Sequence, residues 1–234
     1  MFNYLEFEDK IMNSPFRKMR IKIKEPSKLP NVLNISEMTS IFKSAYENKK
    51  VIKVESGYDY FESLRNIVVV ELLFATGARV SEIANLTDSQ IDVCSGDLTI
   101  RGKGDKERII QICNKETIQI LKKYRKLFIA KINTSGGYFL VNRLNKKLSD
   151  QSIRIIVKNI SKKASIKTHV TPHALRHTVT TLLLEKDVDI KYIQSILGHS
   201  SIVTTQIYTH VNREKQKQIL KMKHPRKEFS NQTF

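Results

Sequence analysis

One stretch of the chain is apolar on nearly every side. Between Leu64 and Phe74 most positions carry large aliphatic side chains, namely Ile67, Val68, Val69, Val70, Leu72 and Leu73. A helix that is apolar all round must be buried against other elements on every face. Gly77 follows shortly afterwards, and glycine readily adopts the left-handed conformation that ends a helix. The stretch therefore predicts a central, buried helix around which the rest of the chain packs.

Most of the remaining pattern is helical. Ser36 is a candidate cap for a helix that runs through Tyr46, and Thr171-Pro172 combines a capping hydroxyl with a first-turn proline. Further helices are expected over residues 115–132, 149–164, 190–197, 201–210 and 213–223. β-Branched residues gather instead in 91–93, 98–100 and 109–112, with turn residues between them. The sequence therefore predicts a mainly α-helical α+β fold with a small three-stranded antiparallel sheet.

The charge of the chain indicates a polyanionic partner. Its 41 Lys and Arg residues exceed its 23 Asp and Glu residues, for a formal net charge of +18. Such a surface suits nucleic acid better than a small acidic metabolite. Cys94 and Cys113 form no CxxC pair and have no histidine nearby at zinc-ligand spacing, and no apolar run is long enough to cross a membrane. We expect double-stranded DNA as the partner, no membrane, no small-molecule substrate, and a cytoplasmic location.

Several polar residues fall where the predicted scaffold would hold them rigidly. His173 and Arg176 are three residues apart on one helix, so they share a face. Arg79 directly follows the buried helix, and Glu82 lies in the first turn of a short helix that Ser81 is expected to cap. Lys103 lies between two glycines at a hairpin tip, where its long side chain could reach a bound groove.

Five separated blocks of this chain resemble the catalytic blocks of the tyrosine recombinase, or phage-type integrase, family. They occur in that family's order and extend over most of residues 31–212. The blocks are Ala75-Thr76-Gly77-Ala78-Arg79-Val80-Ser81-Glu82-Ile83, Gly102-Lys103-Gly104, His173-Ala174-Leu175-Arg176-His177, Leu197-Gly198-His199 and Tyr208. A single short motif would be weak, but several in order are specific. The resemblance implies the family's catalytic-domain fold and a site-specific DNA recombinase of the integrase or transposase type.

The resemblance also implies a role for each matching residue. Tyr208 would be the nucleophile and would form a 3′-phosphotyrosyl link, so that neither a metal nor a nucleotide cofactor is needed. Arg79 and Arg176 would bind the nonbridging phosphate oxygens, because guanidinium groups pair with phosphate in a bidentate manner. His173 would act as general base for the phenol, and Lys103 as general acid. His199 would donate a hydrogen bond to the phosphate, and Glu82 would orient Arg79 or a neighbouring histidine.

Other polar residues have simpler explanations. We expect His177 and His210 to point away from the site, and Tyr192 to pack in the core. Lys106 and Arg108 are candidates for contacts with the DNA backbone, or for a solvated strand edge. No acidic cluster has the spacing of a two-metal site. The alternative to an active recombinase is a non-catalytic DNA-binding relative, or a fragment that binds DNA without productive recombination.

The family comparison also divides the chain. Residues 1–30 are expected to be an N-terminal helix remnant and basic linker from the end of a missing core-binding domain, and residues 31–212 the catalytic domain. Residues 213–234 would form a C-terminal helix and tail that could contact a neighbouring protomer. We expect a homotetramer on DNA and allow for a monomer in isolation.

Overall fold

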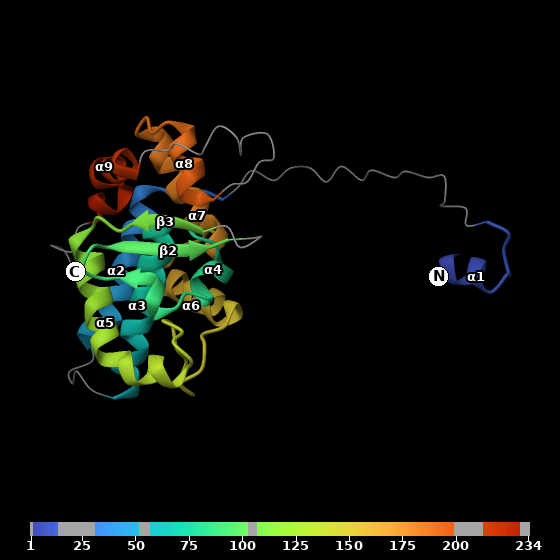
Figure 1. Cartoon of the computed structure of the whole chain (residues 1–234), viewed down its shortest axis with the longest axis horizontal. Coiled ribbons are helices and arrows are strands. Elements are labelled where there is room, and N and C mark those ends of the chain that lie inside the picture. The colour runs from blue at the N-terminus through green and yellow to red at the C-terminus, as the bar shows by residue number, and fades with distance from the viewer. Residues whose placement is uncertain (1, 14–30, 52–56, 103–106, 199–212, 230–234) are drawn as a thin grey trace.

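The computed structural model describes residues 2–13, 31–51, 57–102, 107–198 and 213–229 (Figure 1). The helices are α1 Phe2–Phe7, α2 Ile35–Val51, α3 Tyr58–Thr76, α4 Val80–Ala84, α5 Lys115–Thr134, α6 Asp150–Lys163, α7 Pro172–Glu185, α8 Ile190–Leu197 and α9 Arg213–Lys223. Short 3-10 helices span Asp88–Gln90 and Pro225–Glu228. The strands are β1 Ile91–Asp92, β2 Asp97–Arg101 and β3 Glu107–Gln111. The mainly helical α+β prediction is confirmed, while the helix expected over 201–210 lies outside the described residues.

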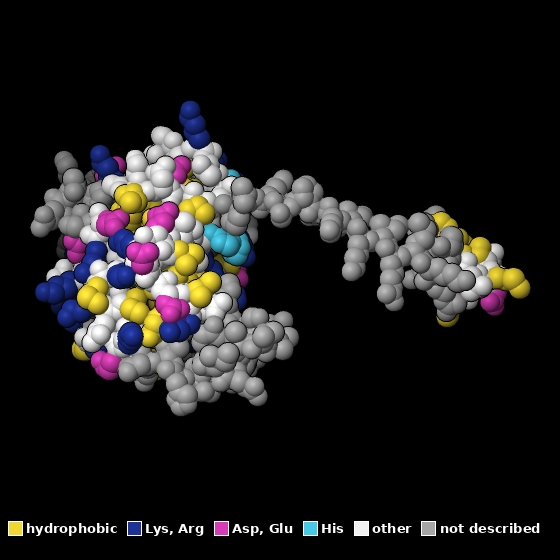
Figure 2. Space-filling model, turned by 90° about the horizontal axis from the view of Figure 1, so that it is seen from above, with side chains coloured by type: hydrophobic (Ala, Val, Ile, Leu, Met, Phe, Trp, Pro, Cys, Tyr) yellow, Lys and Arg dark blue, Asp and Glu magenta, His cyan; other side chains and the backbone are white. Residues whose placement is uncertain are grey.

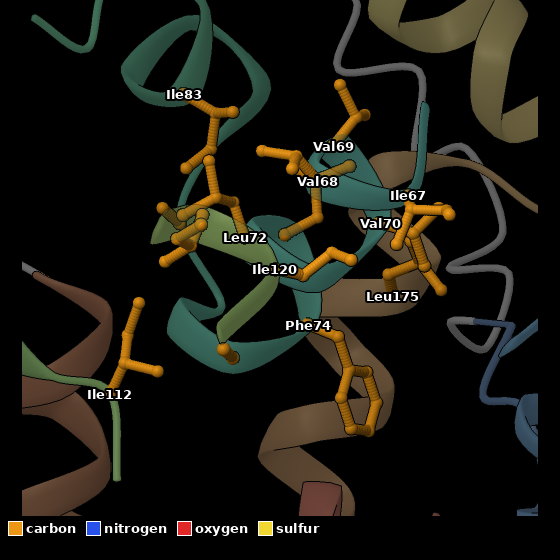
Figure 3. Close-up of a cluster of buried hydrophobic side chains, with 14 of the residues drawn as sticks. Ile67, Val68, Val69, Val70, Leu72, Phe74, Ile83, Ile112, Ile120 and Leu175 are labelled. Atoms are coloured by element: carbon orange, nitrogen blue, oxygen red, sulfur yellow. The ribbon is translucent and has the colours of Figure 1, made fainter. Parts of the chain in front are cut away.

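Helix α3 is the centre of the core, as its composition predicted. Helices α2, α5 and α7 all pack against it. Figure 3 shows its aliphatic side chains clustered with Ile83 of α4, Ile120 of α5 and Leu175 of α7. The helix ends at Gly77, which has φ 57° and donates its amide to the Leu73 carbonyl. The predicted left-handed C-cap is therefore confirmed, and it turns the chain abruptly toward Arg79.

Two of the predicted helix caps are wrong. Helix α2 is capped by Asn34, whose side chain accepts from the Glu37 amide at 2.8 Å while Glu37 accepts from the Asn34 amide at 3.0 Å. This reciprocal pair satisfies two amides at once, which a cap at Ser36 would not do. Helix α4 likewise begins after Arg79, so Ser81 lies inside its first turn. The Thr171 cap and the proline that follows it are confirmed in α7.

The sheet is the predicted antiparallel meander in the order β1-β2-β3. Leu98 pairs with Ile110 across β2 and β3, and both side chains are fully buried. Arg108 lies opposite Ile100 in the same ladder. The tip of this hairpin, residues 103–106, is outside the described part of the chain. The described register nevertheless places Arg108 directly after Glu107, the first residue of β3.

The C-terminal segment is anchored on the core of its own chain. The Arg226 side chain is completely buried and pairs with the equally buried Glu71 of α3, with Nε to Oε2 at 2.9 Å and Nη2 to Oε1 at 2.7 Å. Tyr46 and Thr117 also donate to Glu71. Phe229 packs against Phe42 and Phe74. The described C-terminal residues therefore form part of the folded core, and the predicted contact with another protomer stays a prediction.

Replacing Arg226 with methionine should destabilise the protein strongly. The substitution leaves the Glu71 carboxylate buried without its cation, which typically costs about 3–5 kcal/mol. The free energy of unfolding in urea would measure this. Arg101→Met is the matched control, because the Arg101–Glu107 pair is exposed and should contribute less than about 1 kcal/mol. Equal losses in the two variants would contradict the assignment of Arg226 as a buried anchor.

His224 should make the stability of the C-terminal segment depend on pH. Burial lowers the pKa of His224 to about 4, and its Nδ1 accepts the Arg226 amide. The unfolded chain has a histidine pKa of about 6.5, so it binds more protons than the folded chain at intermediate pH. The contribution of His224 to the free energy of unfolding is therefore complete above the unfolded-state pKa of about 6.5, and it falls as the pH drops toward 4.

Urea unfolding at pH 7.5 and pH 5 should show this loss in the parent protein. The His224→Asn variant keeps an acceptor near Nδ1 but does not titrate, so its loss over the same interval should be smaller. The difference isolates His224 from the other histidines. Identical pH dependence in both proteins would refute a role for this side chain.

Candidate active site

Arg176 joins three separate parts of the fold. It extends from α7, is only 5% exposed, and donates from Nη1 to the Gly77 carbonyl at 2.7 Å and from Nη2 to the Leu197 carbonyl at 2.8 Å. It therefore ties the end of α3 and the end of α8 to α7. Burial, followed by the charge of Arg79, lowers the pKa of Arg176 to about 10, so the group remains cationic at neutral pH.

Arg79 lies beside this group and is more accessible. It is the residue that precedes α4, and its side chain is 45% exposed. Its Nη1 donates to Oε1 of Glu82 at 3.1 Å, while its backbone amide donates to Oε2 at 2.7 Å. Glu82 therefore holds both the backbone and the side chain of Arg79. Of the groups that Glu82 was expected to orient, the described residues pair it with Arg79, and the orienting role itself stays a prediction.

Glu82 has a second arginine partner that the sequence patterns did not reveal. Arg108 of β3 donates from Nη1 and Nη2 to the two carboxylate oxygens at 3.1 and 2.7 Å. Burial acts to raise the pKa of Glu82, but the hydrogen bonds from Arg108 and from the Arg79 amide outweigh it and lower that pKa. The Arg108 side chain is 12% exposed, so the solvated-edge interpretation is wrong.

His173 and His177 form a pair on α7. Their Nε2 atoms lie 3.0 Å apart and their ring centroids 4.4 Å apart. The expectation that His177 points away from the site residues is therefore wrong, and the four-residue spacing on a helix was the available signal. Burial, then the charges of His173 and Arg176, lowers the pKa of His177. Figure 2 shows histidine side chains exposed at the edge of the face seen from above.

Two motif glycines permit close packing around these arginines. A Cβ atom on Gly77 would lie 2.8 Å from Cδ2 of the buried Leu197. A Cβ atom on Gly198, which ends α8 in the left-handed conformation, would lie 2.8 Å from Nη1 of Arg108. At both positions a Cβ atom would force the neighbouring side chain to move. These glycines therefore let α8 approach α3 and the sheet closely.

The structure thus brings Arg79, Glu82 and Arg176 together, with His173 on the same helix as Arg176. Lys103, Lys106, His199, Tyr208 and His210 lie outside the described residues, so the structure does not locate them. Tyr192 packs in the core as expected, with 7% of its surface exposed. Over the described ranges, no group of three His, Cys, Asp or Glu side chains could hold a metal ion, and no helix is long and apolar enough to span a membrane.

The fold is that of a tyrosine recombinase catalytic domain. The phage integrase family model matches residues 46–215, so the chain belongs to the phage integrase, or tyrosine recombinase, family. It is 44% identical over 228 residues to a tyrosine recombinase of Agathobacter rectalis, covering 97% of this chain and 74% of that protein. It is 33% identical to tyrosine recombinase XerC of Pediococcus pentosaceus, covering 96% of this chain and 72% of that protein.

Solved structures agree with this assignment. The crystal structure of XerA recombinase superposes with a TM-score of 0.64 at 34% identity, covering 85% of this chain and 66% of that one. XerH site-specific recombinase bound to its difH substrate gives a TM-score of 0.61 at 27% identity, covering 92% of this chain and 60% of that one. The chain is therefore an enzyme of the tyrosine recombinase type, which cleaves and joins DNA strands. The non-catalytic alternative is not favoured by these relatives.

Arg176→Lys should destabilise the protein although it keeps the charge. A single ammonium group cannot reproduce the forked contact with both the Gly77 and Leu197 carbonyls, and one unsatisfied buried acceptor costs about 1–3 kcal/mol. Urea unfolding and hydrogen exchange in α8 would show the loss. Arg154→Lys, at an exposed position of α6, is the control and should change neither quantity. Equal stability of both variants would mean that Arg176 does not hold these elements together.

Proposed function

We propose that this chain recombines double-stranded DNA by transesterification at a site formed by Arg79, Lys103, His173, Arg176, His199 and Tyr208. The observation that carries the proposal is the convergence of Arg79 and Arg176 from separate segments, one accessible and one fixed by two carbonyls. Paired guanidinium groups of this kind suit the nonbridging oxygens of a phosphodiester, and they can stabilise the charge of a pentacoordinate transition state.

The reaction balances without a cofactor. The Tyr208 oxygen attacks the scissile phosphorus and its proton passes to His173, since a phenol with a pKa of about 10 needs a base at neutral pH. The bond from phosphorus to the 5′ oxygen breaks, and Lys103 supplies the proton that makes this oxygen a hydroxyl. The product is a 3′-phosphotyrosyl link that keeps the energy of the phosphodiester. Attack by another 5′-hydroxyl reverses these steps and joins the strands.

The two remaining residues would assist this chemistry. His199 would donate a hydrogen bond to the phosphate, and Glu82 would hold Arg79 in position through the two contacts described above. Lys106 is proposed to contact the DNA backbone. No step requires a metal ion or a nucleotide.

DNA as the partner is supported by the net charge of +18 and by the likeness to XerH bound to its difH substrate. Exchange between two duplexes requires four strand cuts, and each protomer offers one nucleophile. We therefore propose a homotetramer on DNA, assembled from monomers. Residues 31–212 would form the catalytic domain, residues 1–30 would be an N-terminal helix and basic linker, and residues 213–234 would contact a neighbouring protomer. Such an enzyme would act in the cytoplasm, where its DNA lies.

A suicide substrate tests the nucleophile. The substrate is a pool of nicked duplexes with randomised sequence around the nick. Cleavage releases a short strand that carries the 5′-hydroxyl. Because this strand diffuses away, the reverse reaction is prevented and any covalent protein–DNA adduct is trapped. The parent protein should form an adduct that resists denaturing electrophoresis, with or without a chelator. Tyr208→Phe should form none and should still bind DNA in a mobility-shift assay.

Tyr192→Phe is the matched control, because Tyr192 is buried in α8, and it should retain adduct formation. An adduct that persists in Tyr208→Phe would assign the nucleophile to another residue. Failure of the parent protein to form any adduct with the pool would refute the proposed cleavage reaction.

A further inference from the structure

Arg108 is committed to the protein interior and not to solvent. Besides its bidentate pair with Glu82, it donates from Nε to the Ile196 carbonyl at 2.9 Å. One side chain of β3 thereby reaches both α4 and the last turn of α8. All three guanidinium nitrogens of Arg108 therefore donate to protein acceptors, and these bonds hold the group between α4 and the end of α8.

The surrounding backbone is built to admit this group. Gly198 closes α8, and a Cβ at that position would lie 3.0 Å from Cζ and 3.2 Å from Cδ of Arg108. The Arg108 side chain therefore packs closely against the turn, and a side chain on residue 198 would displace it. The carbonyls of Ile196 and Leu197, which a helix end leaves without intrahelical partners, are bound by Arg108 and Arg176 respectively. Two arginines together fix the end of α8.

The charge of the cluster depends on Arg108 as well. Glu82 is the carboxylate that contacts Arg79, and on its own it would offset much of the positive charge that Arg79 offers to a phosphate. Arg108 supplies a second cation at 2.7 Å from the same carboxylate. The described cluster then contains three guanidinium groups and one carboxylate, and Arg79 keeps an exposed surface. Its field remains positive where a phosphate would bind.

We infer that Arg108 is a positioning residue of the recombinase site, which acts through Glu82 to hold Arg79 toward the scissile phosphate and to offset the Glu82 charge. This inference rests on the proposed role of Arg79 in binding phosphate. It replaces the sequence-based assignment of Arg108 as a contact to the DNA backbone. Replacement of Arg108 should therefore lower the rate of cleavage more than the affinity for DNA, because a misplaced catalytic group costs far more in the transition state than in binding.

The first test is single-turnover cleavage of a suicide duplex selected from the randomised pool. Arg108→Gln should lower the rate at saturating DNA by about 10- to 100-fold and leave the half-saturating DNA concentration unchanged. Arg125→Gln is the matched control, because Arg125 forms a similar 2.7 Å pair with Asp88 away from the cluster, and it should cleave at the parent rate. Weaker DNA binding with an unchanged saturating rate would overturn the inference and favour a backbone contact.

A double-mutant cycle tests whether Arg108 acts through Glu82. The loss caused by Arg108→Gln should be much smaller in a Glu82→Gln background, since the carboxylate that it holds is then absent. If the double variant loses rate by the product of the two single losses, Arg108 and Glu82 act independently and the coupling is refuted. If Arg108→Gln fails to fold, Arg108→Lys decides the question: it keeps the charge, loses the forked contact, and should show a partial loss of rate that also shrinks with Glu82→Gln.

A measurement without DNA separates this inference from the proposed function. In isotope-labelled protein, the NMR order parameter of the Arg79 Nε–H group should fall in Arg108→Gln. It should stay at the parent value in Arg125→Gln. If the parent protein forms no adduct but Arg79 responds in this way, the positioning role stands and the cleavage proposal fails. If the Arg79 signal is unaffected by Arg108→Gln, the positioning role is wrong whatever the outcome of the cleavage assay.

Discussion

The buried guanidinium of Arg176 is the contact on which the arrangement of the site depends. It bonds the carbonyl of Gly77, where α3 ends, and the carbonyl of Leu197, where α8 ends. Both carbonyls belong to helix ends, which lack intrahelical partners for their last acceptors. A cation is also favoured at a helix C-terminus by the helix dipole. One side chain thereby satisfies acceptors from two helices and fixes both relative to α7, so the group expected to bind phosphate is also part of the scaffold.

Burying a cation carries a desolvation cost, and the structure limits it in two ways. The two carbonyls replace part of the hydration of Arg176, and the ionised Glu82 supplies a negative charge nearby. The pKa of Arg176 falls only to about 10, far above neutrality. Close packing contributes as well, because Gly77 and Gly198 bring α8 near enough for short hydrogen bonds. The glycines in these two blocks are therefore explained by contact distances as well as by left-handed turns.

The sequence predicted those features that depend on local pattern. The apolar run of α3, the Gly77 cap, the meander and the Thr171-Pro172 helix start each follow from residues that are neighbours in the chain. Arg79 and Arg176 were identified through family blocks. The pairing of Arg108 with Glu82 joins positions 26 residues apart in sequence, and its bond to Ile196 spans 88. No periodicity encodes such contacts. The caps at Ser36 and Ser81 were wrong because a nearby residue offered a better acceptor or a reciprocal pair.

The distinction between local sequence pattern and long-range contacts also explains the form of the site. Local pattern builds a rigid apolar helix whose end is sharply defined, and long-range polar contacts then attach other elements to that end. Since residues 67–76 of α3 are all buried, the position of Gly77 is set by the core. Arg79, two residues later, inherits this rigidity through the Glu82 contacts, while its side chain stays accessible. A group that must meet a charged phosphate is thus exposed at its tip and immobilised at its base, which is the condition for electrostatic preorganisation.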